Sequence, residues 1–262
     1  MGIKKYFMLW WLFTRITTQV ALQSRFGTVI FLVGKLLRFT FFLLFLVLLV
    51  SKTKSIASYS FWQVIFFFAT FNLLDSIPQF LWREVYRFRN YIMRGFFDYI
   101  ITKPISPLFR CLFGGSDILD LFILLISVVF AIYSAGQLSV VTFTGVIVYM
   151  LLIINALLIS LAFHIFVLSV GVVTTEVDNS IMLYRDLTQM GRVPIDVYQE
   201  PLRGLLTFVI PVGMMMTFPA KALMGILSLE NMLYAVLFSI TLLFLSLYFW
   251  QFSLKKYASV SS

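Results

Sequence analysis

The stretch from Arg83 to Arg110, REVYRFRNYIMRGFFDYIITKPISPLFR, carries six of the 20 basic residues of the chain. Long apolar stretches precede and follow it. Basic residues gather next to membrane spans on the cytoplasmic side. This segment, named the island below, therefore predicts an all-α polytopic membrane protein and marks its cytoplasmic face.

The composition excludes a water-soluble globular protein. Hydrophobic residues make up 61% of the 262 residues, and mean hydropathy is +0.99. Only 12% of the residues are charged, whereas soluble domains average roughly 25%. The net charge of +9 then reflects membrane topology, and no nucleic-acid partner is expected. The single cysteine, Cys111, excludes an intrachain disulfide and a cysteine metal cluster.

Six stretches are long and apolar enough to span a membrane, which takes about 20 residues. They cover residues 26–50, 59–82, 112–133, 140–173, 202–218 and 232–252. The fourth is long for one crossing. A single crossing places fifteen basic residues inside and three outside, compared with eleven and seven for a double crossing. The positive-inside rule therefore favours six spans in one transmembrane domain over 1–262, with both termini cytoplasmic.

The segments outside the spans are short. Residues 83–111 and 174–201 are expected to be cytoplasmic loops with short helices. Residues 1–25 mix tryptophans with lysines and hydroxyl side chains, which is typical of an amphipathic helix at the membrane surface. The alternative is one long first helix. Lys35 and Arg38 lie inside the first span, so they must reach the headgroups, face protein or mark a later start.

The island contains a predicted amphipathic helix at about residues 91–102. Its apolar face is formed by Ile92, Phe96, Tyr99 and Ile100, and a second face by Arg94, Asp98 and Thr102. Two prolines, Pro104 and Pro107, are expected to end it. The helix has the character of a docking surface, and the alternative is a basic loop that binds lipid.

Polar residues inside the spans indicate two further sites. Asn72, Asp75 and Gln79 share one face of the second span, where they line a path for substrate or water or else form a polar seam to another helix. Pro211, Gly213 and Pro219 interrupt the short fifth region. Such a break indicates a hinge and a re-entrant turn near Phe218 and Pro219, or simply irregular packing around a methionine run.

The residues for catalysis are missing from the sequence. His164 is the single histidine, so it is interpreted as an interhelical hydrogen-bonding group rather than a metal ligand. Gly27, Gly34 and Lys35 do not match the spacing of a phosphate-binding loop. We therefore expect no enzymatic activity in this chain and no cofactor.

Two stretches together resemble the permease subunits of type-2 ATP-binding-cassette (ABC) transporters, and among them a six-span group. The first is MRGFFDYIITKPISPLFR after the second span, and the second is GRVPIDVYQEPLRGLLTFVIPVGMMMTFPAKAL. The N-terminal helix, the six spans and the cytoplasmic termini fit the same resemblance, which covers nearly the whole chain.

The resemblance implies a permease in a bacterial-type plasma membrane, and export is the usual direction in the family. Its partners are a separate ATPase subunit that hydrolyses ATP, a second permease that is identical or similar, and membrane lipid. The island helix then becomes the coupling helix, with Arg94, Phe96, Phe97, Asp98 and Tyr99 as candidate ATPase contacts. The alternatives are an ion-coupled transporter that uses Asp75 or His164, and a membrane scaffold without transport.

Overall fold

The computed structural model describes residues 2–139, 141–175 and 177–257, so the predicted start of the fourth span at Val140 lies outside the described residues. Within these ranges the chain consists of helices and loops, apart from an isolated bridge between Ile56 and Tyr59. The predicted all-α fold is confirmed.

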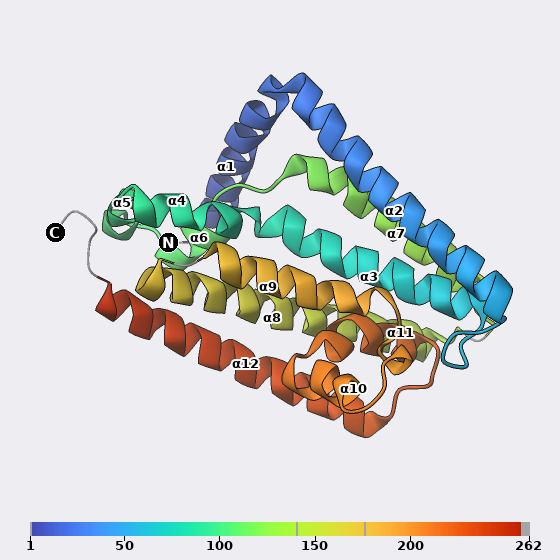
Figure 1. The fold of residues 1–262 in the computed structure, drawn as a ribbon. Coiled ribbons are helices and arrows are strands. Elements are labelled where there is room, and N and C mark those ends of the chain that lie inside the picture. The colour runs from blue at the N-terminus through green and yellow to red at the C-terminus, as the bar shows by residue number, and fades with distance from the viewer. Residues whose placement is uncertain (1, 140, 176, 258–262) are drawn as a thin grey trace.

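Five helices in the described part of the chain are long and apolar enough to cross a membrane. They are α2 (Arg25–Thr53), α3 (Phe61–Leu81), α7 (Ile118–Gly136), α8 (Phe143–Thr174) and α12 (Leu229–Lys256). All five run along the long axis of the molecule (Figure 1). The fourth apolar stretch forms one unbroken helix, α8, as expected for a single crossing.

The core forms around α3. In the most apolar 18-residue stretch of α3, 67% of the residues are buried, compared with 11% in α2 and 17% in α12. Phe66, Phe67, Phe68 and Phe71 of α3 are all buried, as expected for a helix that is apolar on every side. The outer helices α2 and α12 therefore present apolar surface to whatever surrounds the subunit.

Polar side chains connect α8 to α12. The Asn155 amide donates to the backbone oxygen of Ala235 at 3.2 Å, and the Ser239 hydroxyl donates to the Asn155 side-chain oxygen. All three residues are buried. Hydrogen bonds of this kind hold helices together where hydrophobic burial alone does not favour association.

The N-terminal helix α1 (Ile3–Gln23) is separate from α2, because the chain breaks at Ser24 and turns sharply (Figure 1). Only Thr14 of α1 is buried. The chain thus has two helices here rather than one long first helix. The position of α1 at a membrane surface stays a prediction.

Four short helices gather at one end of the bundle, named the island end (Figure 1). They are η1 (Arg83–Arg87), α4 (Phe88–Met93), α5 (Phe96–Thr102) and α6 (Pro107–Phe113). The start of α1 and the last turn of α12 lie at this end as well. The opposite end is named the hairpin end.

The segment of residues 178–197 is named the polar segment. It comprises α9 (Asp178–Gln189), η2 (Met190–Arg192) and η3 (Ile195–Val197). At the island end Arg89 Nη1 lies 3.0 Å from Asp178 Oδ2, and at the hairpin end the Tyr59 hydroxyl donates to Asp196 at 2.9 Å. Residues 178–197 of the predicted cytoplasmic loop over 174–201 therefore extend between the two ends of the bundle, and partners at each end pair Asp178 and Asp196.

The predicted fifth span, residues 202–218, is bent. Its helical arms, Leu202–Val209 and Gly213–Leu223, meet at 79°. The break falls at Ile210, which is extended before Pro211, rather than near Phe218 and Pro219. Lys221, after the bend, lies 2.8 Å from Asp196, before it, so the hairpin begins and ends at the same end of the bundle. The polar segment, and not residues 202–218, makes the fifth connection between the two ends.

Candidate functional site

The predicted island helix over 91–102 is two helices. Gly95 has φ of +69° between α4 and α5, a left-handed conformation that glycine adopts without strain. The turn ends α4 and redirects the chain, so the expected common face is divided. Ile92 and Ile100 are buried, whereas Phe96 and Tyr99 are 49% and 68% exposed.

Of the candidate ATPase contacts, Phe97 alone is fully buried. Its ring lies 6.4 Å from Trp250 and 5.0 Å from Tyr257, at the end of α12. Arg94 is exposed and Asp98 is half-buried. Phe97 therefore fixes α5 to the bundle. The exposed surface of α5 is formed by its neighbours Phe96 and Tyr99.

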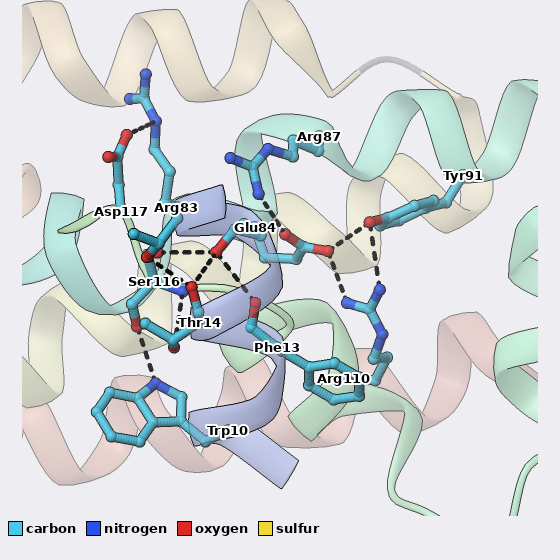
Figure 2. Close-up of polar contacts among 12 residues, drawn as sticks. Trp10, Phe13, Thr14, Arg83, Glu84, Arg87, Tyr91, Arg110, Ser116 and Asp117 are labelled. Carbon is cyan, nitrogen blue, oxygen red and sulfur yellow. Dashed lines mark hydrogen bonds and ion pairs between the residues drawn. The ribbon is translucent and has the colours of Figure 1, made fainter. Parts of the chain in front are cut away.

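A buried carboxylate, Glu84, is the centre of the network that Figure 2 shows. Its Oε2 accepts a hydrogen bond from Arg87 at 3.0 Å. Its Oε1 accepts from Arg110 at 2.6 Å and from the Tyr91 hydroxyl. The guanidinium of Arg110 also lies 4.7 Å from the centre of the Phe13 ring. A single carboxylate thus connects η1, α4 and α6 and, through Arg110, α1.

Two of the groups that bond Glu84, Tyr91 and Arg110, stay protonated at neutral pH. Burial and then the Glu84 carboxylate raise the pKa of Tyr91 to about 12, so its hydroxyl stays protonated and donates. Burial acts to lower the pKa of Arg110, but the charge and hydrogen bond of Glu84 outweigh it and raise that pKa. Both groups therefore remain hydrogen-bond donors to Glu84 at neutral pH.

Sequence reasoning did not select Glu84, Tyr91 or Arg110 as a set. The available signal was an acidic residue among the arginines of the island. Nothing in the spacing indicated that Arg110, 26 positions away, pairs with it.

The turn of residues 114–117, named the α1 dock, holds the N-terminal helix. Trp10 Nε1 donates to Ser116 Oγ at 2.8 Å, and the Thr17 hydroxyl donates to the Ser116 backbone oxygen at 3.2 Å. In the same turn Arg83 Nε lies 3.5 Å from Asp117 Oδ2 (Figure 2). The α1 dock is thereby linked to the island.

A methyl group at Gly115 should loosen the α1 dock. A Cβ there would lie 2.3 Å from Thr17 Cγ2. We expect Gly115→Ala to destabilise the protein by about 1–3 kcal/mol through overpacking, with faster proteolysis of α1. A lower thermal midpoint in detergent and earlier cleavage within residues 3–23 are the measurements. Gly136→Ala is the control, because a Cβ there meets no atom within 4 Å; equal behaviour of the two variants would contradict the prediction.

A second polar cluster lies inside the bundle. Lys35 Nζ pairs with Asp120 Oδ1 and lies 3.1 Å from Gln79 Oε1. Gln79 Nε2 donates to Asp75 Oδ2 at 2.8 Å, and Arg38 Nη2 lies 3.4 Å from the same oxygen. Lys35 therefore faces protein, which was one of the three expected placements, whereas the Arg38 side chain is paired with Asp75 and still 43% exposed.

The predicted set of Asn72, Asp75 and Gln79 lines one small cavity, together with Lys35 and Arg38. Asp75 and Gln79 are directly bonded, while Asn72 donates to the backbone oxygen of Phe68 in its own helix. Asp120, which completes the cluster, was not selected from the sequence. Their role in a translocation path stays a prediction.

The predicted hinge residues lie in the hairpin. Gly213 is buried, and a Cβ there would lie 2.9 Å from Thr207 Oγ1 across the bend, so the two arms meet at this glycine. Pro211 lies at the bend and Pro219 in the first turn of α11 (Phe218–Leu223). The structure shows a bend of 79° between the two arms, and movement about it stays a prediction.

The prediction that His164 forms a hydrogen bond to another helix is wrong. Its Nδ1 lies 2.7 Å from the backbone oxygen of Ser160 in the preceding turn of α8, and its ring packs against Trp82 and Tyr184. Within the described ranges no group of three or more histidine, cysteine, aspartate or glutamate side chains is placed to hold a metal ion.

A model of the family described as ABC-2 family transporter protein matches residues 36–261. The match includes the island, the polar segment and the hairpin, and it leaves out all of α1 and the first eleven residues of α2. The curated proteins and the solved structures gave no match to this chain.

Proposed function

This chain belongs to the ABC-2 family transporter proteins, and we propose that it is the permease of an exporter driven by a separate ATPase subunit. Members of this family are membrane components of ABC transporters. The observation that carries the proposal is the pair of exposed aromatic side chains on α5, Phe96 and Tyr99. Exposed aromatics beside charge are typical of a protein contact.

The island is built to pass movement into the membrane helices. Phe97, one residue from Phe96, packs on the end of α12, and Glu84 connects the island to α6 and α1. A push on α5 by an ATPase that closes on ATP therefore reaches α12 and α1. Packed side chains with few voids transmit such displacements because they are hard to compress.

The other parts of the proposal follow from charge and exposure. Arginines and lysines concentrate at the island end, which supports our proposal that this end and both termini lie on the cytoplasmic side of the membrane. We propose a bacterial-type plasma membrane. The exposed apolar sides of α2 and α12 leave room for a second permease subunit and for lipid. We propose that substrate moves outward along the interface of the two permeases, past Asp75 and Gln79.

The test is purification of the tagged chain in mild detergent, with an ATPase identified by its P-loop peptides. We expect Phe96→Ala with Tyr99→Ala to reduce the bound ATPase about ten-fold or more, since central aromatic contacts each contribute about 2 kcal/mol or more to an interface. The control is Phe143→Ala, an 83% exposed aromatic outside the island, at the start of α8.

Equal ATPase recovery from the double variant and wild type would contradict the assignment of α5 as the coupling surface. Transport that requires a proton gradient and no ATPase would overturn the function itself. Phe97→Ala is a third informative variant, because a loss of folding rather than of contact is expected when its buried ring is removed.

A further inference from the structure

A groove between α2 and the polar segment is rich in arginine. It encloses about 340 Å³ and is lined by Arg38, Met182, Arg185, Asp186, Gln189 and Arg192. One wall comes from α2 and the other from α9 and η2. Three of its six lining residues are therefore permanent cations.

The protein neutralises these arginines incompletely. Arg38 has Asp75 at 3.4 Å, yet its side chain is 43% exposed. Among the described residues no carboxylate forms an ion pair with Arg185 or Arg192. Asp186 shares the groove, and Asp120 is already paired with Lys35. The groove thus keeps cationic groups available to an anion.

Arg192 lies deep in the bundle. Its guanidinium is 5.8 Å from the centre of the Phe71 ring and 5.1 Å from that of Phe42. Phe71 is midway along α3, so this cation lies far from both ends of the bundle. A cation at such depth is costly unless it has a partner, and intramembrane cations mark binding paths.

The small cavity of about 20 Å³ that holds Asp75 and Gln79 adjoins the groove and shares Arg38 and Arg192 with it. Its aromatic wall is formed by Phe39, Phe42, Phe68 and Phe71. The two spaces together place guanidinium donors beside aromatic surface. Arginine binds phosphate and carboxylate through paired N–H donors, and an apolar chain gains by contact with the exposed apolar side of α2.

We propose that this groove binds an anionic amphiphile, with a phosphate or carboxylate head against Arg38, Arg185 and Arg192 and an apolar tail along the exposed apolar side of α2. The assignment of this ligand as cargo rests on the proposed transport function. The binding itself requires only this chain.

The probe is lysophosphatidylglycerol, with lysophosphatidylcholine of the same chain length as the neutral-headed comparison. Affinity for the purified chain in detergent is measured by native mass spectrometry. We expect the anionic probe to bind more tightly. Arg192→Gln and Arg185→Gln should each weaken it about ten-fold, and Arg192→Lys should retain part of the affinity. The control is Arg203→Gln, which removes an arginine paired with Glu200 outside the groove.

Asp75→Asn is expected to raise the affinity for the anionic probe, whereas the arginine variants lower it. A gain in affinity cannot come from misfolding, so this variant separates the two explanations. The substitution frees Arg38 from its carboxylate, so it should strengthen binding of the anionic probe several-fold. Equal affinity for the two probes, or no change with Arg192→Gln and Asp75→Asn, would overturn the proposal.

A final measurement distinguishes a transported ligand from a lipid that stays bound. With the ATPase bound, trapping by ATP and vanadate should lower the affinity for the probe if the groove carries cargo. An unchanged affinity leaves the anion site in place and removes the cargo assignment. Failure to recover any ATPase removes the proposed function without affecting the binding measurements.

Discussion

Replacing Glu84 by glutamine is expected to destabilise the protein by about 3–5 kcal/mol, because it leaves the partly buried Arg110 without its carboxylate. The amide keeps the size of the side chain but not its charge, and Arg87 loses its partner as well. The thermal midpoint in detergent should fall by on the order of 10 °C. Since Glu84 links the island to α6 and, through Arg110, to α1, proteolysis of α1 should also accelerate.

The matched control is Glu200→Gln. Glu200 forms a similar pair with Arg203, at 2.7 Å, but both side chains are about half exposed. Exposed pairs contribute little because water and salt screen them, so the thermal midpoint should stay unchanged. A fall of the same size in both variants, or in neither, would show that Glu84 is not a structural centre of the island.

Replacing Lys35 by methionine is expected to have a similar cost, about 3–5 kcal/mol, since Asp120 is 1% exposed and would keep a charge without a cation. Gln79 also loses the Lys35 donor, which loosens its contact with Asp75. Lower yield of monodisperse protein and a lower thermal midpoint are the measurements.

The double variant Lys35→Met with Asp120→Leu should recover most of that loss. Removing both charges eliminates the uncompensated carboxylate, and replacement of buried pairs by apolar residues is often neutral or stabilising. Lys52→Met is the control, because Lys52 is exposed near the end of α2. A double variant as unstable as the sum of the single changes would exclude direct coupling between Lys35 and Asp120.

The helices themselves could be predicted from the sequence to within a few residues. Apolar runs of about 20 residues gave α2, α3, α8 and α12 because the length and polarity of a run are local properties. The boundary of α7 was wrong by six residues at its start, Ile118 instead of Leu112. Gly114 and Gly115 end the short helix α6 there, and Asp117 caps the start of α7.

The candidate site was less accessible from sequence. The amphipathic pattern placed Ile92, Phe96, Tyr99 and Ile100 on one face, but the turn at Gly95 separates Ile92 on α4 from the other three residues on α5. Within α5, Ile100 is buried whereas Phe96 and Tyr99 are exposed. Helical periodicity places residues on a common face only if the helix is unbroken. A glycine in the sequence allows a break but does not show that one occurs. The buried role of Phe97 depends on α12, which lies more than 130 positions away along the chain.

The sequence by itself determined that the chain is a polytopic helical membrane protein, where its apolar helices lie and which segment is most basic. Only the tertiary structure decided that residues 178–197 run the length of the bundle, that residues 202–223 bend back, and that Glu84 and Asp120 are the buried carboxylates paired with Arg110 and Lys35. The physical reason is that hydrophobicity acts residue by residue, whereas the charge of a polar group is stabilised by partners that packing brings from distant parts of the chain.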